Sequence, residues 1–485
     1  MPSDRPGIRP DAPGPGSRLR PGATGPGTRP DIVVTGTGVI SPAGLGAARL
    51  WEAMAAGKTF FDHHPGGDRA SSGLPWPTAV VDASETTWPE GRSWADASKY
   101  ANQSARWAVA VARQALAQAG ITGEREDVRG GTIMAVASSG DELSDVIPQL
   151  ASKFRGDSRP LAKFLHDEVP DYSYIRGIPS QLGQFVSMAS GFRGSNVAAY
   201  GEAAAGGAGA LALAARLLET GELDRVLVVG VGAPLTVTGM AAFDQDEPFG
   251  TRATTGAGPF DAERSGTLAG QGAAAVLLER ADVAVGPALA RFLGCEVLAA
   301  ADLPTAAGLA VDAVLAGADA GPTVWWAHGA GSVRLDRVEA DTVLPRTGSL
   351  PVTGSKGTIG NAFECSALID TALAVESLIR AELPPVGLLN RPDPALPGLD
   401  PVLGEPRPLP PPATLLLTAL NQGAEATAAG ALLLATTGAR TTGRAADAGT
   451  AGRAADVRTA GRAADARTSE HRADARTAEH GKAHT

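Results

Sequence analysis

Short runs of consecutive apolar residues, separated by stretches of helical character, recur between residues 31 and 436 and constrain the fold more than any other feature. The runs are Asp31–Gly36, Gly131–Ala137, Asn196–Tyr200, Arg225–Gly230, Ala273–Glu279, Thr323–Ala327 and Ala413–Leu420. Runs without polar alternation are typical of strands that are covered on both faces. The pattern therefore predicts an α/β fold of layered sheets buried by helices.

Helical segments lie between these runs. We expect helices at Ala47–Ala56, Ser104–Ala119 and Cys365–Ala381, and a long alanine-rich helix that ends near Gly221. The alternation of strand and helix occurs twice along the chain. We therefore predict two similar halves of the βαβαβ type, residues 31–250 and 251–436.

The two ends of the chain differ from this pattern. Residues 1–30 contain 14 Pro or Gly and few large apolar groups. Residues 437–485 carry a degenerate nine-residue repeat, in which GRAAD begins at Gly443, Gly452 and Gly461. Neither segment can bury enough apolar surface to offset the entropy of ordering, so we expect two disordered tails.

Charge and cysteine content exclude several classes of protein. Lys and Arg number 42 against 52 Asp and Glu, so no basic excess favours nucleic acid or an anionic membrane. Two cysteines, Cys295 and Cys365, exclude a disulfide scaffold and a four-cysteine zinc site, and we expect no metal. No apolar run resembles a signal peptide or a membrane span, so we expect a cytoplasmic protein.

A dinucleotide cofactor is not expected either. Gly36-Thr37-Gly38 follows the first predicted strand, where a dinucleotide fingerprint would stand. Ser41 occupies the place of the third glycine, which indicates a tight structural turn. We therefore predict no cofactor.

The segment Tyr200–Leu211 joins a predicted strand to a helix. Such an elbow often carries a nucleophile, because the helix N-terminus lowers a thiol pKa and stabilises an oxyanion. Here the segment is mostly Ala and Gly, with Glu202 as its charged side chain. It suits acyl chemistry but has no nucleophile. The alternative is the closely packed start of an alanine-rich helix.

Two further polar groups stand in glycine-rich turns. His328 follows an apolar strand, with Asp336 and Glu339 eight and eleven residues later. Lys356 lies in the loop Gly354–Asn361, where it could polarise a carbonyl or hold a carboxylate. The alternatives are a structural histidine and a surface lysine. Neither cysteine has a basic neighbour to activate it, so we interpret both as buried thiols.

Together these segments resemble β-ketoacyl synthases of the thiolase fold over nearly all of residues 31–436. Val34–Pro42 is similar to the opening motif VTGxGxxSPxG, and Pro259–Gly266 with Gly270–Gly272 is similar to PFDxxRdGfvxGEGAG. Downstream, Ala327–Gly329 with Asp336 and Glu339 resembles AHGTxTxxxD..E, and Lys356–Gly360 matches KxxxGH up to its last residue. The resemblance implies two halves in a layered α-β-α-β-α arrangement.

A condensing enzyme of that family uses an elbow cysteine and two histidines. His328 matches one histidine, and Asn361 stands in place of the other. The elbow position holds Ala203 or Ala204, and Asn421–Ala424 replaces the Gly-Phe-Gly-Gly loop that gates acyl access. Alanine cannot form a thioester, so the chain is not expected to condense acyl groups alone.

This pattern resembles the chain length factor, or KSβ, subfamily of type II polyketide synthases. Ala205–Leu211 is similar to its AGGxDAL motif, with Gly209 in place of the Asp. Aromatic-type members place Gln at the elbow, where this chain has Ala, so the product class stays open. The resemblance implies a heterodimer with an active ketosynthase, with Asn196–Tyr200 near the dimer axis.

The same resemblance implies that an acyl carrier protein and the growing polyketide are partners. The tunnel that limits chain length would be lined by Ser138–Leu150, which includes Glu142 and Leu143, and by residues near Tyr200 and Glu202. Two alternatives stay open. One is a malonyl-thioester decarboxylase that uses His328 and Lys356, and the other is a stand-alone thiolase-fold protein that binds acyl carrier protein.

Overall fold

The computed structural model describes most of the region between the two tails. The described residues are 30–61, 76–122, 128–136, 150–169, 172–176, 178–201, 203–232, 240, 249–251, 253, 256–421 and 427–438. All of them belong to one compact unit, Pro30–Thr441. The tails predicted to be disordered lie outside the described residues, apart from Pro30 and residues 437–438.

Two sets of five strands repeat the same order along one sheet. The first set is β1 (Ile32–Ser41), β4 (Gly130–Val136), β5 (Asn196–Tyr200), β6 (Arg225–Gly232) and β8 (Gly272–Arg280). The second is β9 (Ala290–Ala299), β10 (Val324–Trp326), β11 (Pro351–Thr353), β15 (Thr414–Leu420) and β16 (Ala428–Ala435). The spatial order is β5-β4-β6-β8-β1 in one set and β11-β10-β15-β16-β9 in the other.

Strand directions repeat as well. In each set the second strand pairs in parallel with the third and the fourth, and the fifth runs antiparallel to the fourth and the first. A short antiparallel contact between β1 and β9 joins the two sets into one sheet. The repeated topology confirms the prediction of two similar halves.

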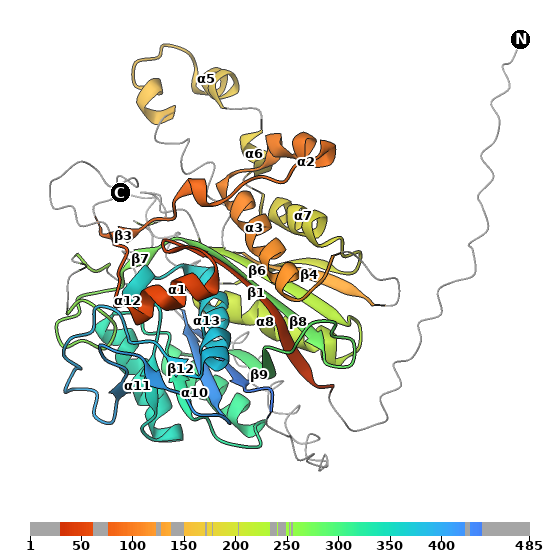
Figure 1. Cartoon of the computed structure of the whole chain (residues 1–485). Helices are drawn as coiled ribbons and strands as arrows, with labels where there is room; N and C mark the ends of the chain where they lie inside the picture. The colour runs from red at the N-terminus through yellow and green to blue at the C-terminus, as the bar shows by residue number, and fades with distance from the viewer. Residues whose placement is uncertain are drawn as a thin grey trace, which may run out of the picture. The chain divides into compact units, whose positions relative to one another are not determined.

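Helices form three layers around these strands (Figure 1). On the first set, α3 (Gln103–Gln118) packs against β1 and β8, and α7 (Pro179–Ser190) packs against β4 and β5. On the second, α10 (Leu303–Ala316) and α11 (Val333–Thr347) pack against β16 and β15. Between the two sets lie α8 (Ala203–Glu219) and α13 (Ser366–Arg380). This is the predicted α-β-α-β-α arrangement.

The alanine and glycine content of α8 follows from its place in the central layer. The helix contacts β4 and β6 on one side and β9 and β16 on the other. A Cβ on Gly207 would lie 2.3 Å from the backbone oxygen of Glu364, and a Cβ on Gly430 of β16 would lie 2.7 Å from the Cβ of Ala208. Larger side chains would push the layers apart.

Shorter elements complete the described fold. They are β2 (Gly44–Leu45), α1 (Ala47–Ala55), β3 (Thr78–Ala79), η1 (Ala83–Glu85), α2 (Arg92–Ala97), η2 (Ser98–Tyr100), α5 (Leu161–Glu168), α6 (Ser173–Arg176), β7 (Ala269–Gly270), α12 (Lys356–Ile359), η3 (Phe363–Cys365), β12 (Glu382–Leu383), β13 (Asp400–Pro401) and β14 (Arg407–Pro408). Among the described helices, none is long and apolar enough to cross a membrane.

All seven predicted strands and all four predicted helices are present. The elements β9, β16, α7, α10 and α11 are not among those that the sequence pattern predicts. The boundary between residues 250 and 251 stays a prediction. Strand β8 comes after this boundary in the sequence, yet in the sheet it lies between β1 and β6, within the first set.

Two glycines of α8 test the close packing of the central layer. We expect Gly207→Ala to destabilise the protein by about 1–3 kcal/mol, because its Cβ would meet the Glu364 backbone. The matched variant Gly209→Ala meets nothing within 4 Å and is expected to stabilise the helix by up to about 1 kcal/mol. Midpoints of thermal unfolding measure both. Equal shifts in the two variants would contradict this account.

Candidate functional site

The elbow between β5 and α8 is built from small residues. Ala204 and Ala205 are buried, and a Cβ on Gly201 would lie 2.5 Å from the Cα of Gly206. The chain therefore turns into the helix without room for larger groups. For Ala203 the structure describes only the backbone, and Glu202 lies outside the described residues. No nucleophile stands among the described residues of this elbow.

The first turn of α8 is capped from the other half of the molecule. The side-chain oxygen of Asn421, at the end of β15, accepts a hydrogen bond of 3.2 Å from the backbone N–H of Ala205. Ala205 is the third residue of the helix, a position that an N-cap side chain normally bonds. Asn421 is only 2% exposed. Residues 422–424, where the resemblance implies a replaced gating loop, lie outside the described residues.

His328 lies directly after β10, and its ring is enclosed. The residue is 2% exposed, and neither ring nitrogen has a hydrogen-bond partner among the described residues. Burial, together with the nearby charge of Lys356, holds the pKa of His328 well below its usual range. The ring is therefore neutral and its nitrogens are available for hydrogen bonding.

Two buried carboxylates of α11 hold the turn that carries His328. Glu339 accepts hydrogen bonds from the backbone N–H groups of His328 at 2.6 Å and Gly329 at 2.9 Å, and from the Thr418 hydroxyl. Burial raises the pKa of Glu339 to about 7. These contacts give the predicted Glu339 a positioning role.

Asp336 ties the same turn to the motif around Phe260. Its carboxylate accepts hydrogen bonds from the backbone N–H groups of Gly331 at 3.0 Å and Phe260 at 2.8 Å. It also forms an ion pair with Arg264 at 3.0 Å. Burial raises the pKa of Asp336 to about 6. Two of the sequence motifs thus meet through one carboxylate.

Lys356 is buried and is not the surface lysine that the sequence left as an alternative. Its ammonium lies 3.2 Å from the carboxylate of Asp370 on α13. Asp370 also accepts from the Ser355 hydroxyl at 2.5 Å and from the Trp326 indole at 3.0 Å. The sequence reading missed Asp370, because an acidic residue within an apolar helix carries no local signal of its partners.

Asn361, which the resemblance aligns with the second histidine, stabilises the start of α13. Its side-chain oxygen accepts from the backbone N–H of Phe363 at 3.0 Å and from the Ser366 hydroxyl at 2.8 Å. The residue is 1% exposed. The amide oxygen therefore serves the local turn.

Both cysteines are buried free thiols, as predicted. Burial raises the pKa of Cys295 and of Cys365, so neither is a ready nucleophile. The predicted tunnel residues Glu142 and Leu143 lie outside the described residues. For Tyr200 the structure describes the backbone in β5 but not the side chain.

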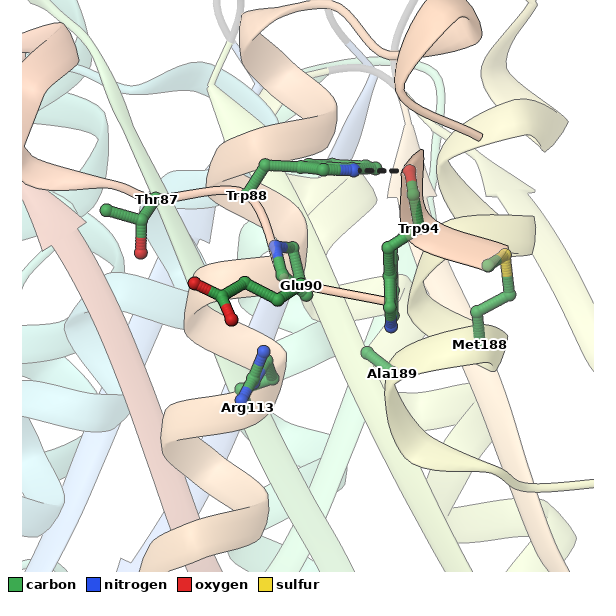
Figure 2. Close-up of a pocket in the computed structure, with 8 residues that line it drawn as sticks. Thr87, Trp88, Glu90, Trp94, Arg113, Met188 and Ala189 are labelled. Carbon is green, nitrogen blue, oxygen red and sulfur yellow. Dashed lines mark hydrogen bonds between the residues drawn. The ribbon is translucent and has the colours of Figure 1, made fainter. Parts of the chain in front are cut away.

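A separate cleft lies between the segment before α2 and the helices α3 and α7. It has a volume of about 670 Å³, and Trp88, Trp94, Glu90, Arg113 and Met188 are among the residues that line it (Figure 2). The indole of Trp88 donates to the backbone oxygen of Trp94 at 2.8 Å. None of the predicted site residues contributes to this cleft, so it is distinct from the elbow.

Known proteins match this chain over most of its length. Residues 29–284 match the family model described as "Beta-ketoacyl synthase, N-terminal domain". The ketoacyl synthase β subunit of the tetracenomycin polyketide synthase of Streptomyces glaucescens is 29% identical over 398 residues, which cover 78% of this chain and 92% of that protein.

Solved structures share the fold. The ishigamide ketosynthase/chain length factor aligns with a TM-score of 0.69 and 20% identity over 84% of this chain and 100% of that one. The type II ketosynthase AntDE, bound to a hexaketide and in complex with its acyl carrier protein AntF, aligns with the same score, identity and coverage.

The buried carboxylate of Glu339 predicts a pH dependence of stability. Its pKa rises from an ordinary 4.5 to about 7 on folding, so the folded state holds the proton more tightly. This contribution is present below pH 4.5 and is lost as the pH rises to about 7, by roughly 3 kcal/mol. Glu339→Gln cannot titrate. We expect the stability of the native protein relative to this variant to fall over that range.

Unfolding free energies of both proteins at pH 5 and pH 7.5 measure this difference. Parallel profiles for the native protein and the variant would show that Glu339 does not titrate in this range.

Proposed function

The chain belongs to the β-ketoacyl synthase family, and on that premise we propose that it is a non-catalytic chain length factor of a type II polyketide synthase. It would pair with an active, cysteine-bearing ketosynthase. The observation that carries the proposal is the contrast at the site. The segment between β5 and α8 has alanine and no nucleophile among its described residues, and Asn421 caps the helix there, whereas the turn of His328 is held by hydrogen bonds to Asp336 and Glu339.

Loss of the thiol removes the covalent step. A condensing ketosynthase transfers the acyl chain to an elbow cysteine, and neither Ala203 nor Ala204 can accept it. Cys295 and Cys365 do not replace it, since both are buried with raised pKa values. Chain growth would therefore occur on the cysteine of the partner.

The free edge of β5 supports pairing with a partner. In the described part of the chain, β5 ends the sheet and pairs only with β4. Its sequence, Asn-Val-Ala-Ala-Tyr, has no charge and no proline, the usual devices that protect an exposed edge. An equivalent strand of a related subunit would satisfy the free backbone groups and extend the sheet.

Exposed apolar side chains near α7 support the same interface. In the described part of the chain, five of the ten exposed large apolar side chains lie within residues 161–178: Leu161, Leu165, Tyr172, Ile175 and Ile178. Ile178 directly precedes α7, which packs on β5, so this end of the segment lies near the strand with the free edge. Exposed large apolar side chains at that end are candidates for burial against a partner.

The relatives also suggest two further binding partners, an acyl carrier protein and the growing polyketide chain. The AntDE structure holds both a carrier protein and a hexaketide. We propose that this chain, with its partner, receives a carrier-bound chain in the same way. The wall that limits chain length would include Glu142, Leu143, Tyr200 and Glu202.

A decarboxylase of malonyl thioesters is less well supported. His328 is neutral with unpartnered nitrogens, as that chemistry needs, but it is only 2% exposed. The charge of Lys356 is paired with Asp370, and by the family resemblance Asn361 stands where a second histidine would help to stabilise an enolate. Mass spectrometry of malonyl-carrier protein incubated with this chain tests it, and an acetyl product would favour the decarboxylase.

Co-expression with a cysteine-bearing ketosynthase from the same source tests the proposed function. We expect a stable one-to-one complex by native mass. Ala198→Pro should abolish that complex. The backbone carbonyl of Ser195 faces β4 and accepts a hydrogen bond of 2.9 Å from the N–H of Thr132. Because the backbone groups of successive strand residues point to alternate sides, the N–H of Ala198, three residues later, points to the free edge. Proline there removes an edge donor without breaking the pairing of β5 with β4.

Ala198→Ser is the matched control, because it keeps the backbone N–H and should still form the complex. Thermal unfolding of both variants checks that they fold. A well-folded native chain that never binds the ketosynthase would contradict the proposal and would favour the stand-alone carrier-protein binder.

A further inference from the structure

The cleft between the segment before α2 and the helices α3 and α7 has the size of a small-molecule site. Its volume is about 670 Å³, within the range of roughly 300–1,000 Å³ that ligand pockets occupy. All the residues that line it belong to the described part of the chain, and none of them lies in the segment between β5 and α8. What this cleft binds can therefore be inferred without reference to the proposed function.

Two indole rings form one wall of the cleft, and the protein fixes their orientation. The ring centroids of Trp88 and Trp94 lie 5.3 Å apart, and the rings are nearly perpendicular, at 86°. The indole N–H of Trp88 donates to the backbone oxygen of Trp94 at 2.8 Å, and its ring meets the buried ring of Phe185 on α7 at 85° and 5.4 Å. Rings held in this way lose little freedom when a flat apolar group packs on them. This wall therefore favours an aromatic group.

Glu90 and Arg113 bring opposite charges to the same cleft. Figure 2 shows the two side chains pointing toward one another, with no hydrogen bond between them. Both residues are exposed, and neither side chain has an ion-pair or hydrogen-bond partner among the described residues. A guanidinium group binds a carboxylate through two parallel hydrogen bonds, and a carboxylate accepts hydrogen bonds from an ammonium group. Each of the two charges is therefore available to a ligand.

Two opposite charges in one cleft disfavour ligands that carry a single charge. An organic cation held by Glu90 would be repelled by Arg113, and an organic anion held by Arg113 would be repelled by Glu90. A ligand that carries both charges is attracted by both side chains, so charge complementarity favours a zwitterion.

We propose that this cleft binds a zwitterionic small molecule with an aromatic body, the chemical class of the aromatic amino acids. The carboxylate of the ligand binds Arg113, and its ammonium group binds Glu90. Its ring packs against the indoles of Trp88 and Trp94. The flexible thioether of Met188, on α7, adapts to the shape of the ring.

Isothermal titration calorimetry with the full chain at pH 7 tests the ring and the two charges. The zwitterionic probes are L-phenylalanine and L-tryptophan. Phenethylamine and tryptamine keep the ring and the cation, 3-phenylpropionate and 3-indolepropionate keep the ring and the anion, and L-alanine keeps both charges without the ring. We expect an aromatic amino acid to bind at least about tenfold more tightly than its two single-charge analogues and than L-alanine, because each loses a hydrogen-bonded charge or the ring contact.

Two substitutions of exposed residues assign the charges. Glu90→Gln removes the partner of the ammonium group, so the amino acid should bind about tenfold more weakly, whereas the carboxylic acid analogue should not weaken. Arg113→Gln should weaken the amino acid by a similar factor without weakening the amine analogue. Trp94→Ala should weaken all three compounds, since each of them packs its ring on the indole.

Glu382→Gln is the matched control, because Glu382 is an exposed glutamate on β12 and does not line the cleft. Its affinity for the amino acids should equal that of the native chain, and thermal unfolding checks that every variant folds.

Three outcomes would overturn the inference. One is that neither amino acid binds, and another is that Glu90→Gln and Arg113→Gln leave the affinities unchanged. The third is an amine or a carboxylic acid that binds as tightly as its amino acid, because the cleft would then recognise a single charge. None of these outcomes bears on the proposed function, which is tested by complex formation with a ketosynthase.

Discussion

The close approach of α8 to both sheets is the constraint on which the rest of the molecule depends. It places a helix whose residues 203–210 are all Ala or Gly between two sets of strands. Gly207 meets the Glu364 backbone, and Ala208 meets Gly430. Since interiors are close-packed, this spacing determines where β15 ends and where the helix begins. The elbow, and the residue that caps it, are consequences of that packing.

Around the elbow, the polar groups of the site also hold the fold together. Glu339 and Asp336 bind backbone N–H groups of the His328 turn, and Lys356 is neutralised by Asp370. Removing any of them would leave buried donors or a buried charge unpaired, which is costly. A chain that lost its nucleophile would therefore keep these motifs for structural reasons. This explains how the motifs around His328 can persist in a chain whose described elbow residues include no nucleophile.

Much of the fold could be predicted because the apolar pattern of a segment agrees with how deeply that segment is buried in the fold. Strands such as β6 and β15 are continuous apolar runs, and they are buried on both faces. The elements that were missed lack that agreement. In β9 only a few residues are buried, and α11 is rich in charged residues with Pro345 inside it. At the site, His328 and Lys356 could be found from glycine-rich turns after strands, whereas Asp370 could not.

The sequence by itself determined the family, the alanine-rich composition of the segment between β5 and α8, and the presence of Asn361 in a glycine-rich loop, because each depends on which side chain stands at a position in a local motif. Tertiary structure decided which groups meet. It paired Lys356 with Asp370 and brought Asn421 to a helix that begins more than 200 residues earlier. Such contacts depend on the spacing of packed layers, and no local pattern encodes that spacing.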